Sequence, residues 1–147
     1  MTRIALASDH AGVALKADLA AWLRGCGHDV SDLGPVSDAS VDYPDFGYKL
    51  GRAIAAGEAE LGIAICGSGI GISIAVNRNP ACRCALVSDG LSARLARQHN
   101  DANVLALGAR LIGPETARDC VQQFLATPFL GDRHAPRVAK LASPEFT

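Results

Sequence analysis

Short apolar runs alternate along the chain with longer segments whose apolar residues recur at helical spacing. The short runs predict five strands, at residues 3–8, 28–33, 61–66, 84–88 and 103–107. The remaining segments predict helices at residues 12–27, 45–57, 72–77, 90–99, 114–124 and 134–141. Recurrence at i, i+3 and i+4 indicates one buried helix face, whereas a short continuous run bounded by glycine or proline indicates a buried strand.

Strands that alternate with helices are typical of a parallel sheet covered on both faces. Because crossover connections are right-handed, we expect a three-layer, doubly wound (Rossmann-like) α/β domain with a five-stranded parallel sheet. A chain of 147 residues is long enough for one such domain, so residues 1–147 are expected to form a single domain. Ligands of such sheets bind beyond the carboxyl ends of the strands. This rule predicts a site at residues 9–10, the loop before Tyr43, and residues 66–71, 88–89 and 108–110.

Composition narrows the functional classes. Hydrophobic residues make up 49% of the chain, charged residues 20%, and the formal net charge is −1. This balance disfavours a basic nucleic-acid binder and an acidic disordered chain. No apolar run approaches the roughly 18 to 20 residues of a membrane span, and the first apolar run is too short for a signal peptide. We therefore expect a soluble cytoplasmic protein with neither a nucleic-acid nor a membrane partner.

The five cysteines do not suggest a disulfide framework. Their number is odd, and the chain shows no secretory signal. Cys82 and Cys84 form a C-x-C pair, but no second ligand pair lies nearby, so we expect no metal site. Most of the cysteines are expected to be small buried residues.

The strongest chemical signal is the segment CGSGIGIS at residues 66–73, which joins a predicted strand to a predicted helix. Glycines there let backbone N–H groups turn inward and bind an anion. The segment lacks the third glycine of a dinucleotide fingerprint and the lysine of a Walker loop. Ile72 also stands where a cysteine phosphatase has arginine. What remains is Cys66 beside an anion-binding turn, as a base or a nucleophile. The alternative is a plain tight turn with an inert cysteine.

Polar residues elsewhere offer further candidates. His99 lies in the sequence QHNDAN, where helix termination explains the asparagines and aspartate but does not require a histidine. Arg133 and Arg137 are four residues apart and share one face if that segment is helical, and Arg110 follows another strand. Arginine forks match phosphate oxygens, although a solvated charged face explains the same pattern.

Several separated motifs together carry a family resemblance. They are Ser8-Asp9-His10-Ala11-Gly12, Asp42-Tyr43-Pro44, residues 66–77, residues 97–105, Gly108-Ala109-Arg110, Arg133-His134 and Arg137-Val138. In this order they resemble the type B ribose-5-phosphate isomerases, a family that also includes galactose-6-phosphate isomerase subunits. The resemblance extends from Ile4 to about Val138. One branch of the family lacks the cysteine and has glutamate at the position of Ile72, so this chain resembles the cysteine branch.

The resemblance implies a role for each matching residue. Cys66 would be the catalytic base that moves a proton between C1 and C2 of the sugar, and His99 would help to open the furanose ring. The implied substrate contacts are Asp9 and His10 for sugar and phosphate, Tyr43 lining the site, Gly67, Ser68, Gly69, Ile70 and Gly71 holding the enediolate oxygens, Asn100, and Arg110, Arg133 and Arg137 clamping the phosphate. The family builds its site across a subunit interface, which implies a homodimer or tetramer. No cofactor or metal is implied.

The sequence therefore predicts an aldose–ketose isomerase of the pentose phosphate pathway that interconverts ribose 5-phosphate and ribulose 5-phosphate through an enediolate. Three alternatives stay open. The substrate could be erythrulose 4-phosphate, allose 6-phosphate or galactose 6-phosphate. The chain could be a non-catalytic sugar-phosphate-binding subunit, although such a subunit needs neither Cys66 nor His99. A cysteine hydrolase would release phosphate, but the phosphatase arginine is missing.

Overall fold

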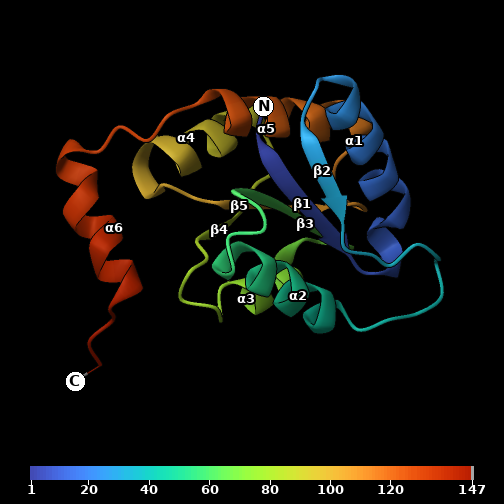
Figure 1. Ribbon diagram of the computed structural model, residues 1–147, viewed down its shortest axis with the longest axis horizontal. Helices are drawn as coiled ribbons and strands as arrows, with labels where there is room; N and C mark the ends of the chain where they lie inside the picture. Colours follow the sequence, from blue (N-terminus) through green and yellow to red (C-terminus); the bar gives the residue numbers. More distant parts are fainter. Residues whose placement is uncertain (147) are drawn as a thin grey trace.

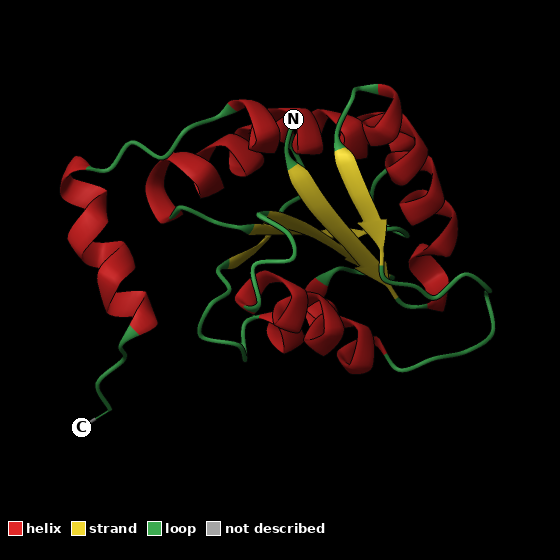
Figure 2. Ribbon diagram, viewed as in Figure 1, coloured by secondary structure: helices red, strands yellow, loops and turns green. Residues whose placement is uncertain are grey.

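The computed structural model describes residues 1–146 and contains a five-stranded parallel sheet between two layers of helices (Figure 2). The strands are β1 (Arg3–Ser8), β2 (Asp29–Asp32), β3 (Leu61–Cys66), β4 (Cys84–Leu86) and β5 (Val104–Gly108). Their order across the sheet is β2-β1-β3-β5-β4, and every neighbouring pair is parallel. The expected fold class is confirmed.

The chain also forms six α-helices and two 3-10 turns (Figure 1). They are η1 (His10–Gly12), α1 (Val13–Gly25), α2 (Tyr43–Ala55), α3 (Ile70–Val76), α4 (Gly90–Asn100), α5 (Pro114–Ala126), η2 (Asp132–His134) and α6 (Ala135–Ala142). One core cluster joins the sheet to α1, α4 and α5, and the other joins it to α2 and α3. None of the helices formed by residues 1–146 combines the length and apolar character that a bilayer span needs.

Side-chain size along the strands separates the two faces. The inner strands alternate large and small apolar residues, as in the IALA of β1 and the LAL of β5. Successive strand residues point to opposite faces. The isoleucines and leucines therefore meet the three-helix layer, while the alanines meet α2 and α3. Cys66 lies on the alanine face, so α2 and α3 form one wall around it.

Several element boundaries differ by one or two residues from the sequence-based expectation, and two of these differences have a clear physical cause. Helix α2 begins at Tyr43 rather than at residue 45, because Pro44 occupies its first turn, where the fixed φ of proline suits a helix and its missing N–H costs nothing. Strand β4 ends at Leu86, two residues earlier than expected, and Asp89 then caps α4 by accepting a hydrogen bond from the Ser92 N–H at 2.7 Å.

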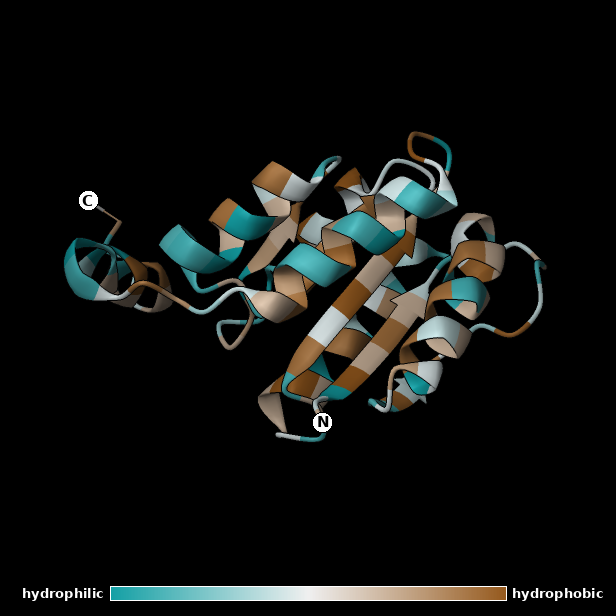
Figure 3. Ribbon diagram, turned by 90° about the horizontal axis from the view of Figure 1, so that it is seen from above, coloured by the Kyte–Doolittle hydropathy of each residue, from teal (hydrophilic) through white to brown (hydrophobic). Residues whose placement is uncertain are grey.

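Helix α6 stands apart from the rest of the domain (Figure 1). It contains no buried residue, although its apolar and polar side chains fall on different faces. Seen from above, it extends sideways beyond the sheet and its covering helices (Figure 3). An amphipathic helix without a buried face has an apolar stripe available for another surface.

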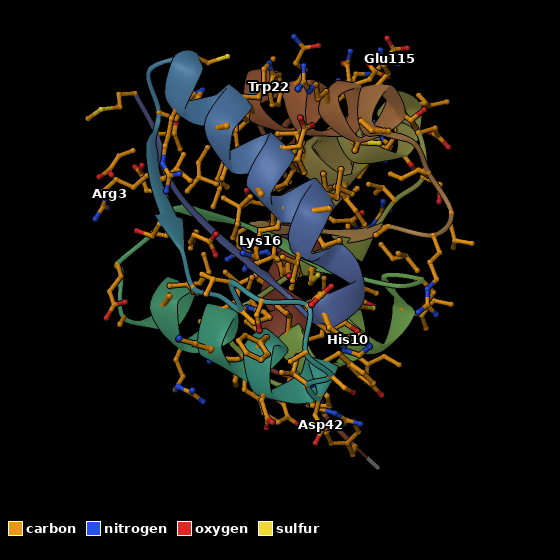
Figure 4. All side chains as sticks on the ribbon, turned by 90° about the vertical axis from the view of Figure 1, so that its right-hand side faces the viewer. Arg3, His10, Lys16, Trp22, Asp42 and Glu115 are labelled. Carbon is orange, nitrogen blue, oxygen red and sulfur yellow. The ribbon has the colours of Figure 1, made fainter. Side chains whose placement is uncertain are left out.

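A buried ion pair links α1 to β2. The Lys16 side chain, labelled in Figure 4, is 1% exposed. Its Nζ lies 2.6 Å and 2.7 Å from the two carboxylate oxygens of Asp32. The same carboxylate accepts the Gly34 N–H at 2.8 Å. Asp32 therefore satisfies a buried cation and also holds the start of the loop that leads to α2.

Asp32→Ala is expected to lower the free energy of unfolding by about 3 kcal/mol, because it leaves the Lys16 ammonium buried without a counter-ion. Lys16→Met removes the charge but keeps the apolar stem, so its loss should be smaller. The double variant should be more stable than Asp32→Ala alone. Urea denaturation measures all three. An Asp32→Ala variant as stable as the unmodified protein would show that the pair contributes no net stability.

Candidate functional site

Cys66 ends β3 at the carboxyl edge of the sheet. Its side chain faces α2 and α3, and the residue is only 4% exposed. The backbone N–H of Gly69 donates a hydrogen bond to the Cys66 sulfur over 3.2 Å. A backbone donor aimed at sulfur stabilises a thiolate more than a neutral thiol, because hydrogen bonds to the charged form are stronger.

The turn after Cys66 needs glycine at two positions. Gly69 has φ +78°, and a Cβ there would lie 2.6 Å from Leu86 Cδ1 and 2.8 Å from the Leu107 carbonyl carbon. Across the turn, a Cβ on Gly108 would lie 2.6 Å from the Ser68 carbonyl oxygen. The turn is therefore packed directly against the end of β5, which fixes its height above the sheet.

This turn presents several backbone donors. The Ile70 N–H donates a hydrogen bond to the Ser68 hydroxyl oxygen at 3.2 Å. Among residues 1–146, the N–H groups of Gly67, Ser68 and Gly71 have no hydrogen-bond acceptor. A turn with free N–H groups beside a sulfur can hold a negatively charged oxygen next to a base.

An open hollow of about 570 Å³ lies over Cys66 and this turn. The Tyr43 ring packs on Gly71 and the Arg110 side chain packs on Gly67, so an aromatic ring and a cation border the turn. The Asp9 residue lines the hollow just after the end of β1, and its carboxylate accepts a hydrogen bond from the Ala11 N–H at 3.0 Å. The lining consists of Asp9, Tyr43, Cys66, Gly67, Ser68, Ile70, Gly71, Ile74, Arg110 and Leu111.

The sequence reasoning missed two of these lining residues. Ile74 and Leu111 are 53% and 66% exposed, which is unusual for large aliphatic side chains beside a polar hollow. Their types alone gave no signal, because aliphatic residues near helix and strand ends are normally core. Ile70, which was expected, is likewise half exposed.

His10 lies next to Asp9 but does not line the hollow. Its Nδ1 accepts the Val41 N–H at 3.2 Å, so a neutral His10 carries its proton on Nε2. The bond ties His10 to the far end of the loop before α2, and His10 and Asp42 lie toward the same end of the molecule (Figure 4). Nε2–H is then the group left to donate to a ligand.

Four expected site residues lie elsewhere in the same chain. His99 and Asn100 end α4, just before β5 begins, whereas Cys66 is paired with Gly108 at the other end of β5. The four steps from Val104 to Gly108 separate the two places by about 13 Å along the strand. Arg133 lies on η2 and Arg137 on α6, and neither lines the hollow.

The expectation that residues 88–89 line the site is wrong. Neither residue borders the hollow over Cys66. Strand β4 ends early, at Leu86, and the Asp89 carboxylate is used as the cap of α4. A side chain that satisfies the helix end in this way is directed at its own backbone and not at a ligand.

The other cysteines lie outside the hollow. Burial raises the pKa of the thiols of Cys82 and Cys84, and burial together with the nearby carboxylates of Asp119 and Asp89 raises the pKa of Cys120 to about 11. These thiols stay protonated and unreactive at neutral pH. Most of the cysteines are buried, as expected, whereas Cys26 is exposed because it follows the last turn of α1. Within residues 1–146, no three His, Cys, Asp or Glu side chains gather to hold a metal ion.

Gly108→Ala is expected to lower kcat by about 100-fold, because the new methyl group pushes the Ser68 carbonyl and displaces the turn beside Cys66. Steady-state kinetics measures the loss, and circular dichroism checks the fold. Gly25→Ala is a matched control, since a Cβ there has no atom within 4 Å. Equal activity of the two variants would show that the height of the turn is unimportant.

Comparison with known proteins gives a consistent set of matches. A family model described as ribose/galactose isomerase matches residues 4–141. Ribose-5-phosphate isomerase B of Escherichia coli is 42% identical over 99% of this chain and 97% of its own. D-erythrulose-4-phosphate isomerase of Pectobacterium atrosepticum is 39% identical over 96% and 93%.

Solved structures agree with these matches. The ribose-5-phosphate isomerase of Thermotoga maritima superposes with a TM-score of 0.94 and 48% identity, over 96% of this chain and 97% of that one. Ribose-5-phosphate isomerase B of Mycoplasma genitalium, solved with bound ribulose 5-phosphate, gives a TM-score of 0.90 and 39% identity, over 95% and 93%.

Proposed function

The chain belongs to the ribose/galactose isomerase family, and we propose that it interconverts ribose 5-phosphate and ribulose 5-phosphate in the pentose phosphate pathway. The observation that carries this proposal is the Gly69 N–H donating to the sulfur of Cys66, at the floor of a hollow rimmed by further free N–H groups. A base and an oxyanion cradle in one turn are what an enediolate reaction requires.

In the proposed reaction the Cys66 thiolate removes the proton from C2 of the open-chain aldose. The electron pair forms the C1–C2 double bond, and the aldehyde oxygen becomes an oxyanion held by the N–H groups of Gly67, Ser68 and Gly71. A proton passes from O2 to O1, Cys66 returns its proton to C1, and C2 becomes the ketone. Each backbone donor in such a cradle typically contributes about 3 kcal/mol to the transition state.

We place the ring-opening and phosphate groups on a second copy of the chain. Within one copy, His99 lies at the opposite edge of the sheet from Cys66. Helix α6 has no buried residue, and the half-exposed Ile70, Ile74 and Leu111 surround the hollow as an apolar contact surface. In a two-fold symmetric homodimer every contact across the interface occurs twice. Such a dimer, alone or within a tetramer, therefore holds two sites that each combine residues of both copies.

The arginines fit a phosphate. Arg110, Arg133 and Arg137 form no ion pair within 4.0 Å among residues 1–146, so their guanidinium groups are uncompensated. Planar guanidinium forks bind phosphate oxygens in pairs. In the proposed dimer, Arg110 of one copy and Arg133 and Arg137 of the other grip the phosphate, and His99 donates a proton to the ring oxygen as the furanose opens.

A substrate panel tests the proposal. Ketose formation is measured from ribose 5-phosphate, erythrose 4-phosphate, allose 6-phosphate and galactose 6-phosphate. We expect the pentose to have the highest kcat/KM. The comparison of pentose with tetrose is the decisive one, because the relatives include both a ribose-5-phosphate isomerase and a D-erythrulose-4-phosphate isomerase. Preference for another sugar would overturn the substrate, and no isomerisation of any would favour a binding subunit.

A further inference from the structure

His99 does not stand alone at the end of α4. The ring of His134 lies flat against it, with ring centroids 4.4 Å apart and 14° between the planes. His134 is 6% exposed, so it is far more enclosed than its neighbours Arg133 and Arg137. We propose that His134 is a positioning residue: its ring is the plate that holds the His99 imidazole where it delivers the ring-opening proton. This inference rests on the proposed function and adds to it a residue that touches no substrate.

Hydrogen bonds hold the segment that leads to His134 against the end of α4. Arg97 Nε donates to the Thr127 carbonyl at 3.3 Å, and the Leu130 N–H donates to the Gln98 carbonyl at 3.1 Å. These two hydrogen bonds hold the segment after α5 against the last turn of α4. The chain then reverses, and the His134 N–H closes the turn by donating to the Gly131 carbonyl at 2.9 Å.

This reversal uses uncommon backbone geometry. Gly131 has φ +64° and Asp132 has φ +51°, in the left-handed region that an aspartate adopts only where the surroundings require it. The consequence is that His134 comes back over His99 and not into solvent. Two residues after His99, Asp101 ends α4 with φ +46°, and its carboxylate accepts a hydrogen bond from Arg97 at 3.0 Å.

The surroundings of His134 also disfavour a charge on its ring. Burial lowers the pKa of His134, and the positive charges of His99, Arg133 and Arg137 lower it further, against the opposite effect of Asp132. Its Nε2 is buried and has no hydrogen-bond partner among residues 1–146, which disfavours a charged ring there. His134 therefore stays neutral and stacks on His99 as an uncharged ring.

Three variants test this role: His134→Ala removes the plate, His134→Phe keeps a flat ring that cannot carry a proton, and Lys140→Ala changes an exposed residue on the same arm. We expect His134→Ala to lower kcat on ribose 5-phosphate by about 30-fold, because small displacements of a catalytic group cost up to about 100-fold. His134→Phe should restore kcat to within about threefold, and Lys140→Ala should leave it unchanged.

A second assay separates positioning from general damage. Ribulose 5-phosphate cannot form a furanose, because its 5-oxygen carries the phosphate. Deuterium uptake at its C1 in D2O therefore reports Cys66 chemistry without ring opening. All three variants should keep this exchange within about twofold of the unmodified protein. Loss of exchange in His134→Ala would assign His134 to folding or assembly, and a His134→Phe variant as slow as His134→Ala would show that the imidazole and not the plate matters. Either result overturns the proposal.

An NMR measurement does not depend on activity. The stacked ring shields His99, so its Cε1–H resonance should lie upfield and move downfield in His134→Ala but not in His134→Phe. An unchanged resonance in both variants would overturn the stacking. Failure of the proposed function is a separate result, since the unmodified protein would then not convert ribose 5-phosphate at all.

Discussion

Replacing Cys66 by alanine is expected to lower kcat on ribose 5-phosphate by about 1,000-fold or more, because it removes the group that takes the proton from C2 in the proposed reaction. Serine should not restore the rate, since its hydroxyl is a far weaker acid and does not form the required anion at neutral pH. Deuterium exchange at C1 of ribulose 5-phosphate should disappear as well. Ligand binding should survive within about threefold, because the turn and the arginines are unchanged.

The control is Cys26→Ala, which removes an exposed thiol at the end of α1. Kinetics gives the rate, and calorimetric titration with ribulose 5-phosphate gives the affinity. Retained turnover in Cys66→Ala would show that the base lies elsewhere. Loss of affinity together with turnover would instead indicate that the substitution collapses the turn.

His99→Ala should lower kcat on ribose 5-phosphate by about 100-fold, because the furanose must then open without a proton donor. Substrates that are always open-chain should be affected far less. Erythrose 4-phosphate is one of them, since its 4-oxygen is blocked by the phosphate and cannot close a furanose. The ratio of the two rates, measured for the variant and the unmodified protein, isolates the ring-opening step.

Asn77, an exposed residue at the carboxyl end of α3 and away from the hollow, offers a control. Its side chain holds β4 by two hydrogen bonds to Cys84, so Asn77→Ala tests general destabilisation. Equal losses on pentose and tetrose in His99→Ala would contradict a role in ring opening.

The fold was predictable because its signals are local. The large–small alternation of the strands and the helical spacing between them give the order of elements. The position of Cys66 at a strand end, and the need for glycine after it, also follow from local sequence. Asp9, Tyr43, the glycine turn and Arg110 border one hollow. Their grouping was predictable because ligands of a parallel sheet bind beyond the carboxyl ends of its strands.

Other features depend on contacts between distant segments. Stacking of His134 on His99 results from a chain reversal at Gly131 and Asp132 that no periodicity encodes. The exposure of Ile74 beside the hollow also gave no signal in sequence. The separation of His99 from Cys66 could have been inferred, since a helix that follows one parallel strand returns to the amino edge before the next.

Mixing two inactive variants tests the central claim most directly. Cys66→Ala and His99→Ala chains are unfolded together, refolded in equal amounts and assayed on ribose 5-phosphate. If each site takes Cys66 from one copy and His99 from the other, half of the dimers are mixed and each holds one intact site, so activity should return to about one quarter of the unmodified protein. A mixture no more active than its parents would contradict a site shared between two copies.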